Sequence, residues 1–129
     1  MSNVEKIRAL LSEVGTDAML ITSGVNRQFS TGFPSSAGTA VVTKAGAWFF
    51  TDSRYIEAAT AKIEGYTVLP VGRGRRYPEL ITEVLNESGA KSVAFEDSRM
   101  TLGEYNSWKA GLEFELVPMG RKLEELRST

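Results

Sequence analysis

Side chains able to form strong polar contacts are concentrated at the end of one predicted strand, in the sequence Asp52-Ser53-Arg54-Tyr55. The planar, forked donors of an arginine suit a substrate carboxylate or an acidic partner surface. The competing interpretation is structural: Asp52 or Thr51 caps a helix, Tyr55 packs, and Arg54 is solvated or pairs with a nearby acid. A cation near a helix N-terminus is slightly unfavourable, which suggests that Arg54 has a partner outside its local structure.

The sequence of 129 residues contains neither histidine nor cysteine. A Ser-His-Asp triad, an imidazole acid–base step, a thiolate nucleophile and most zinc sites are therefore excluded. Two adjacent carboxylate pairs, Glu96-Asp97 and Glu124-Glu125, are predicted to lie on solvated faces. Neighbours in a strand point to opposite sides, so Glu96 and Asp97 make a poor metal site. We expect no catalytic residue and no metal site in this chain.

The basic loop Gly72–Arg76 is the segment that suggests phosphate binding. It lacks the third glycine of a dinucleotide fingerprint and the Lys-Ser/Thr of a P-loop, so a solvated loop is favoured. If these charges are functional, we expect them to meet another domain. Nucleotide binding by this loop stays open as an alternative.

Composition favours one ordinary globular domain. The hydrophobic content of 42% is sufficient for a single core. A formal net charge of −1 gives no electrostatic attraction toward nucleic acid or an anionic membrane. No apolar run approaches the roughly 20 residues that span a bilayer, and the N-terminus lacks a signal pattern. We therefore expect a cytoplasmic location.

Helices and strands alternate along the chain, with one hairpin inserted. Capping boxes begin helices at Ser2 and Thr101, and Leu102, Tyr105 and Trp108 are predicted to face inward. Val25–Ser30 is predicted to form one helical turn. This order predicts an α/β sandwich on a mixed sheet. The predicted strands are Asp17–Thr22, Thr39–Thr43, Ala47–Thr51, Tyr66–Val71, Ser92–Glu96 and Phe114–Pro118, and the first helix is Asn3–Val14.

Several of these segments together resemble one family. Thr31-Gly32-Phe33, Gly38–Thr43 and above all Phe50–Tyr55 resemble the N-terminal domain of Xaa-Pro aminopeptidases, Xaa-Pro dipeptidases (prolidases) and creatinases. The resemblance implies a ribonuclease-H-like α/β fold, a mixed sheet flanked by helices. It also implies a domain over residues 1–120, with residues 121–129 starting a linker helix toward a C-terminal pita-bread catalytic domain.

The resemblance implies a non-catalytic role in a proline-specific metallopeptidase. In that family two divalent metal ions, Mn, Co or Zn, are bound in the C-terminal domain by two aspartates, a histidine and two glutamates. This chain would then serve dimerisation and shape the entrance for proline-containing peptides, with its own catalytic domain and a second subunit as partners. The residues implied as substrate or inter-subunit contacts are Arg54, Asp52, Tyr55, Phe33 and Asn26.

Phenylalanines next to these residues are expected to differ in exposure, with Phe29 in the core and Phe33, beside Pro34, partly exposed. The loop Pro34–Ala37 carries no charged or aromatic side chain, which favours a peptidase over a creatine hydrolase. A free-standing interaction module without catalysis is the alternative function. The reading frame beyond Thr129 would discriminate between the two.

Overall fold

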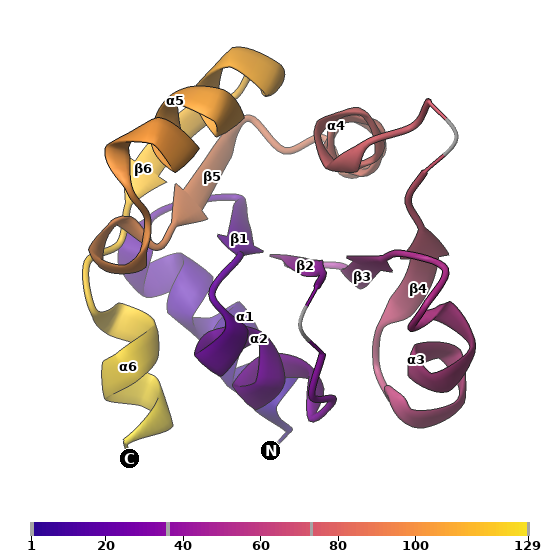
Figure 1. The fold of residues 1–129 in the computed structure, drawn as a ribbon. Helices are drawn as coiled ribbons and strands as arrows, with labels where there is room; N and C mark the ends of the chain where they lie inside the picture. The colour runs from indigo at the N-terminus through magenta and orange to yellow at the C-terminus, as the bar shows by residue number, and fades with distance from the viewer. Residues whose placement is uncertain (1, 36, 73, 129) are drawn as a thin grey trace.

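The structure is a computed structural model that describes residues 2–35, 37–72 and 74–128. Its strands are β1 (Ala18–Ile21), β2 (Thr39–Thr43), β3 (Ala47–Thr51), β4 (Thr67–Pro70), β5 (Ser92–Phe95) and β6 (Glu115–Pro118). Its helices are α1 (Asn3–Val14), α2 (Gly24–Thr31), α3 (Ile56–Lys62), α4 (Tyr77–Ser88), α5 (Leu102–Gly111) and α6 (Lys122–Arg127), with a short 3₁₀ helix, η1 (Asp97–Arg99). Helices α1, α2 and α6 lie on one side of the sheet, and α4 and α5 lie on the other (Figure 1).

The strands of the described residues form one six-stranded sheet in the order β4-β3-β2-β1-β5-β6. β2 pairs antiparallel with both β1 and β3, whereas the pairs β3–β4, β1–β5 and β5–β6 are parallel. This mixed sheet flanked by helices confirms the predicted fold class. The hairpin strands have the predicted bounds, and each of the other strands is shorter than predicted by one residue at one or both ends.

All strands except β2 run in one direction, so their carboxyl ends lie along the same edge of the sheet, which we call the carboxyl edge. The segments that follow these strands begin at Thr22, Asp52, Val71, Glu96 and Met119. Sheets of this kind commonly bind ligands at this edge. The fold therefore gathers most of the polar residues singled out in the sequence into one region.

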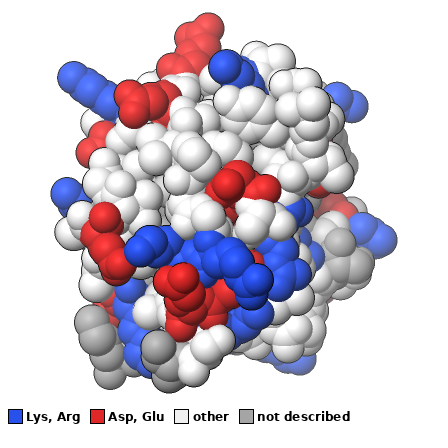
Figure 2. All heavy atoms as spheres, turned by 90° about the vertical axis from the view of Figure 1, so that its left-hand side faces the viewer, with Lys and Arg blue, Asp and Glu red and all other residues white. Residues whose placement is uncertain are grey.

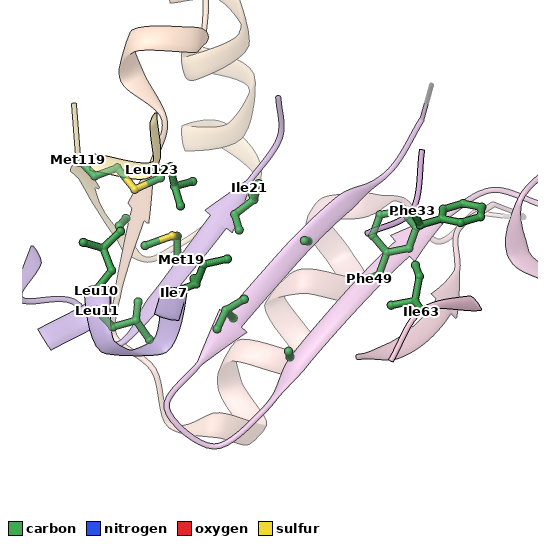
Figure 3. Close-up of a cluster of buried hydrophobic side chains, with 14 of the residues drawn as sticks. Ile7, Leu10, Leu11, Met19, Ile21, Phe33, Phe49, Ile63, Met119 and Leu123 are labelled. Atoms are coloured by element: carbon green, nitrogen blue, oxygen red, sulfur yellow. The ribbon is translucent and has the colours of Figure 1, made fainter. Parts of the chain in front are cut away.

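One face of the sheet is covered by α1 and α6. Ile7 and Leu11 of α1, Met19 and Ile21 of β1 and Leu123 of α6 are buried together (Figure 3). The hydrophobic spacing of α1 predicted this contact, because its apolar residues recur on one side of the helix. Because side chains of both helices are buried in this cluster, α1 and α6 are held side by side.

The opposite face of the sheet is covered by α4. Leu20 of β1, Val41 of β2 and Phe50 of β3 point to this side and pack against Ile81 and Leu85. Successive residues of a strand alternate between faces, so β1 contributes to both cores. Its four residues are all buried, which explains its continuous apolar run.

The first turn of α5 differs from the prediction. Its capping box is present, since Thr101 accepts a hydrogen bond from the Glu104 amide while its own amide donates to the Glu104 carboxylate. Leu102, however, is 75% exposed, so its predicted inward position is wrong. Tyr105 stacks on Phe95 with ring centroids 5.1 Å apart. Residues three positions apart in an α-helix do not lie exactly on one face, because a turn takes 3.6 residues. Tyr105 and Trp108 therefore pack inward, whereas Leu102 turns to solvent.

Gly38, just before β2, provides a test of how closely the chain packs against Phe49 and Phe50 of β3. Its φ is +142°, and a Cβ there would lie 2.6 Å from Cζ of Phe49 and 3.1 Å from the carbonyl oxygen of Phe50. We predict that Gly38→Ala lowers the free energy of unfolding by about 2–4 kcal/mol, because it combines backbone strain with overpacking. Urea denaturation measures this change. Gly103→Ala, whose Cβ would meet nothing closer than 3.9 Å, is the control and should lose no stability; equal losses would contradict the steric explanation.

Candidate functional site

The turn after β3 brings Asp52, Arg54 and Tyr55 together at the carboxyl edge. Nη2 of Arg54 lies 2.8 Å from Oδ2 of Asp52, and the Arg54 amide donates to Oδ1 over 3.0 Å. The guanidinium also lies over the Tyr55 ring, 5.2 Å from its centroid. The Arg54 side chain is 66% exposed. It therefore has a local acidic partner and still presents most of its surface to solvent.

The charges of this pair support each other. The side-chain hydrogen bond from Arg54 holds the pKa of Asp52 below its ordinary value. The same hydrogen bond raises the pKa of Arg54. Both groups are therefore charged at neutral pH. The argument that Arg54 needs a partner outside its local structure is thus wrong, because Asp52 supplies one.

The start of α3 also differs from the prediction. Tyr55 occupies the N-cap position and makes no side-chain capping bond, so neither Asp52 nor Thr51 caps the helix. The Asp52 side chain instead closes the turn onto the Arg54 amide, and its carbonyl accepts from the amides of Tyr55 and Ile56. Aspartate commonly closes turns in this way. Asp52 therefore stabilises the turn through hydrogen bonds to both its side chain and its carbonyl oxygen.

Phe33 lies in the core, so its predicted partial exposure is wrong. It is 6% exposed and makes edge-on contacts with Phe49 and Tyr55, both with ring centroids 6.4 Å apart. Phe29, predicted in the core, is only partly buried against the same cluster. The backbone reverses at Gly32 with a φ of +75°, which turns Phe33 back under the sheet. Buried Phe33 therefore packs against the Tyr55 ring from the core.

A surface cavity of about 540 Å³ lies beside Tyr55. We call it the α2–Tyr55 cavity. It lies between the start of α2 and the segment that follows Phe33, and Val25 on its wall is 48% exposed. The Arg54 turn and this cavity form one continuous candidate contact surface through their shared Tyr55. The residues lining it are Gly24, Val25, Gln28, Pro34, Ser35 and Tyr55.

Arg27 is a buried cation that sequence analysis did not single out. It is 6% exposed, and its guanidinium donates to three carbonyl oxygens: Nη1 to Thr22 over 2.9 Å and to Gly38 over 3.0 Å, and Nη2 to Ser35 over 2.7 Å. Desolvation lowers the pKa of Arg27. The side chain thus joins the end of β1 to the segment between Phe33 and β2. Ser36 lies outside the described residues.

Asn26, a predicted contact residue, is fully buried in α2. Its Nδ2 donates to Oε1 of Glu96 over 2.6 Å. Glu96 also accepts from the Thr22 amide over 2.8 Å and from the amide and hydroxyl of Ser23 over 2.9 and 2.7 Å. The carboxylate therefore closes the start of α2, where backbone N–H groups lack helical partners. Asn26 offers no surface of its own to a partner.

Glu96 and Glu124 are 2% and 6% exposed, so the prediction that both lie on solvated faces is wrong. Glu124 accepts from Nε of Arg99 over 2.7 Å and from Asn26 over 3.4 Å. One sequence signal pointed toward Glu96: it follows a buried strand at the edge where Ser23 begins a helix. Helix starts favour a carboxylate. No comparable local signal marked Glu124.

The basic loop after β4 contributes a tight turn. Gly72 and Arg75 exchange backbone hydrogen bonds, and Arg75 forms an ion pair with Glu83 of α4. Arg73 lies outside the described residues. A cavity of about 520 Å³ lies between this turn and Trp108 of α5. The turn adds exposed positive charge to the carboxyl edge. Nucleotide binding by this loop stays the alternative to the solvated loop that the sequence favours.

Among residues 2–35, 37–72 and 74–128, no three carboxylates lie close enough together to hold a metal ion. The carboxylates that are buried, Glu96 and Glu124, are already occupied by amide, hydroxyl and guanidinium donors. These two carboxylates are therefore already engaged and do not form a metal site with their described neighbours. Within the same described part of the chain, no helix combines the length and apolar character needed to cross a membrane.

Comparison with known proteins identifies the family. Residues 3–129 match the Creatinase/Prolidase N-terminal domain. The chain belongs to this family. Uncharacterized peptidase YqhT of Bacillus subtilis (strain 168) is 38% identical over 125 residues, which cover 96% of this chain and 35% of that protein. The resemblance noticed in the sequence is thereby confirmed.

Solved structures share the fold. An Xaa-Pro dipeptidase from Bacillus anthracis matches with a TM-score of 0.87 and 27% identity, over 96% of this chain and 34% of that one. The N-terminal domain of the cytoplasmic peptidase PepQ from Mycobacterium tuberculosis H37Rv matches with a TM-score of 0.83 and 26% identity, over 96% of this chain and 97% of that one. The chain therefore spans about a third of the full-length relatives YqhT and the dipeptidase, and nearly all of the isolated PepQ domain.

The three carbonyl contacts of Arg27 can be tested by a charge-conserving change. We predict that Arg27→Lys lowers the free energy of unfolding by about 2–3 kcal/mol, because an ammonium cannot reproduce the forked contacts and leaves buried carbonyls unpaired. Urea denaturation measures the loss. Hydrogen exchange should show faster exchange around residues 37–39.

Arg8→Lys is the matched control for this prediction. Within the part of the chain that the structure describes, the guanidinium of Arg8 donates to one carbonyl, that of Thr43, over 2.9 Å, which an ammonium can also reach. We expect a loss below about 1 kcal/mol. Equal losses for the two substitutions would mean that the buried fork of Arg27 has no special role.

Proposed function

We propose that this chain is the N-terminal, non-catalytic domain of a proline-specific metallopeptidase, either an Xaa-Pro dipeptidase or an Xaa-Pro aminopeptidase. One observation carries the proposal: the chain matches the family's N-terminal domain almost end to end, yet covers about a third of the full-length relatives. The sequence has no histidine, so a catalytic centre that uses one would lie in a further domain. We place the protein in the cytoplasm, in line with the cytoplasmic description of PepQ.

The chemistry of such a peptidase would be supplied elsewhere. In the proposed full-length protein, two divalent ions (Mn, Co or Zn) in a C-terminal domain would activate water for attack on the scissile carbonyl. Residues 1–120 would form the present domain, and residues 121–129 would begin the connection to the catalytic domain. This chain's own contribution is to bind, orient and exclude substrates by shape.

The contact surface in this proposal is the Arg54 turn together with the α2–Tyr55 cavity. Arg54 is exposed and charged, and Asp52 orients it by accepting from Nε and Nη2, so its Nη1 would donate to an acidic group of a partner. Tyr55 continues the surface toward Pro34. In a homodimer this surface would lie at the mouth of a neighbouring subunit's active site and narrow it for short proline-containing peptides. Phe33 and Asn26, both buried, would support this surface from within.

A free-standing interaction module remains the second candidate. The exposed Arg54 and the half-buried Trp108 beside the basic turn would also suit a protein partner without catalysis. The reading frame after Thr129 separates the two proposals. A continuation of about two hundred residues with the aspartate, aspartate, histidine, glutamate, glutamate ligand set supports the peptidase, and a stop codon favours the module.

Because the catalytic centre is proposed to lie in a further domain, we predict that the 129-residue chain alone does not hydrolyse Xaa-Pro dipeptides. The reason is chemical: its buried carboxylates already have partners, and the sequence supplies neither histidine nor cysteine. Release of proline can be measured with and without Mn²⁺, Co²⁺ or Zn²⁺, and calorimetry measures metal binding. The full-length protein, assayed in parallel, is the positive control. Micromolar metal binding with matching turnover by the chain alone would contradict the proposal.

Arg54→Ala tests the proposed contact surface. In the full-length protein we expect kcat/KM to fall by roughly 10- to 1,000-fold, because a charge-assisted contact to substrate or to the neighbouring subunit is lost. In the isolated chain the melting temperature should change by no more than about 2 °C, since the side chain is exposed. Steady-state kinetics and thermal denaturation measure the two effects.

Arg75→Ala is the matched control for Arg54→Ala. It removes an arginine that is also exposed and also paired with a carboxylate, Glu83, but that lies on a different turn. We expect it to leave kcat/KM within about threefold of the wild type. Unchanged efficiency with Arg54→Ala, or a large drop in the melting temperature of the chain, would make Arg54 a structural residue.

A further inference from the structure

The side chain of Asn26 in α2 makes contacts with the end of β5 and with α6. Its Nδ2 donates to Glu96, after β5, over 2.6 Å and to Glu124 of α6 over 3.4 Å, while its Oδ1 accepts from Nη1 of Arg127 at the end of α6. Arg99 of η1 donates to the same oxygen of Glu124 over 2.7 Å. We call Asn26, Glu96, Arg99, Glu124 and Arg127 the Asn26 network. It joins α2, the end of β5, η1 and α6.

The charges of the network are balanced around a neutral centre, with two carboxylates and two guanidinium groups. Burial raises the pKa of Glu124, but the hydrogen bonds it accepts, that from Arg99 first, outweigh burial and leave its pKa below the ordinary value. Buried charges are tolerated only when paired. An amide fits the centre because its NH₂ donates to carboxylates and its oxygen accepts from a guanidinium. Neither aspartate nor leucine can do both.

α6 depends on such contacts for its position. It has six residues, too few to be stable as an isolated helix. Its further contacts include buried Leu123 and partly buried Leu126, which pack against the core, and an exposed ion pair between Lys122 and Glu13, 3.0 Å long. Basic and acidic side chains interleave on the face of the molecule that includes α6 (Figure 2). Apolar contacts have no preferred direction, whereas hydrogen bonds do.

We propose that Asn26 is a positioning residue that fixes the orientation of α6 against the carboxyl edge. Leu123 and Leu126 keep α6 against the core, and the network selects one rotation of the helix. This role differs from the direct contact expected from the sequence, because the Asn26 side chain is buried. In a full-length peptidase, the orientation of α6 would determine how the following domain is oriented relative to this one. That last step alone rests on the proposed function.

The substitution Asn26→Asp tests the orientation of α6 in the chain itself. It replaces the donor NH₂ by a carboxylate oxygen between Glu96 and Glu124, at almost unchanged volume. We expect amide hydrogen exchange over residues 122–127 to become at least about tenfold faster. Amides of β2 and β3 should change less than about threefold. Unchanged exchange in α6, or equal acceleration in α6 and the hairpin, would overturn the proposal.

A second substitution provides the rescue. In Asn26→Asp combined with Glu96→Gln, the carboxylate and the amide exchange places, so the amide introduced at position 96 donates to the carboxylate introduced at position 26 and the charge balance returns. We expect part of the lost protection in α6 to come back, because the contact between positions 26 and 96 is restored while the carboxylate at position 26 still faces Glu124. If position 26 only needed a side chain of this size, adding Glu96→Gln would not restore the hydrogen-exchange protection of α6. Protection in the double variant that is no higher than in Asn26→Asp alone would contradict the proposed role.

A milder pair of variants covers the case in which Asn26→Asp does not fold. Arg127→Gln removes one network contact at the end of α6, and Lys122→Gln removes the exposed ion pair from the same helix. We expect Arg127→Gln to accelerate exchange over residues 122–126 severalfold and Lys122→Gln to leave it unchanged. Equal effects would overturn the proposal.

Activity of the full-length protein forms a separate arm of the test. There, Asn26→Asp should lower kcat/KM and the double variant should restore part of it, with the chain still folded. If the wild-type protein has no peptidase activity, the proposed function fails while the exchange results still decide the role of Asn26. If activity is present but unaffected by Asn26→Asp while α6 loses protection, the positioning role holds only within this domain, and the step to the following domain is overturned.

Discussion

The pairing of β1 with β5 is the constraint on which the carboxyl edge depends. Ala18 lies opposite Val93, and Met19 lies opposite Ala94. Continued by two residues, this register brings the end of β1 beside Glu96, whose carboxylate accepts from the first two amides after the strand. Because a shift of one residue would move every buried side chain of β1 to the wrong face, the core enforces the register. The same core therefore fixes the polar contact that begins α2.

Much of the fold was predictable because its elements follow local rules. Both capping boxes formed, α1 has its predicted bounds, and the hairpin strands agree residue by residue. α2 was predicted as a single turn but spans eight residues. Its buried residues are Asn26, Arg27, Ser30 and Thr31, so its inner face is polar and shows no apolar periodicity. A pattern search based on burial of hydrophobic residues cannot detect such a helix.

The candidate site was predictable only where its contacts are short in sequence. Asp52 and Arg54 are two residues apart and meet as one of the weighed interpretations proposed. The partners of Glu96 lie 70 to 74 positions away in the sequence, and those of Glu124 lie 25 and 98 positions away. Carboxylates are mostly exposed in proteins unless they are paired, and these pairings depend on the completed sheet. Sequence analysis therefore assigned both glutamates to the surface.

The edge that results combines rigid buried polar groups with a small exposed charged surface. Asn26 and Arg27 are adjacent in α2, yet one side chain reaches α6 and the other reaches the carbonyls of Ser35 and Gly38. Directional bonds of this kind hold a single arrangement more strictly than apolar packing, and their buried partners make other arrangements costly. Arg54 lies outside this framework, on a turn closed by Asp52 and supported by Phe33 through Tyr55. Its guanidinium is thus exposed to a partner while its backbone is held, which suits a residue that recognises a partner without taking part in bond breaking.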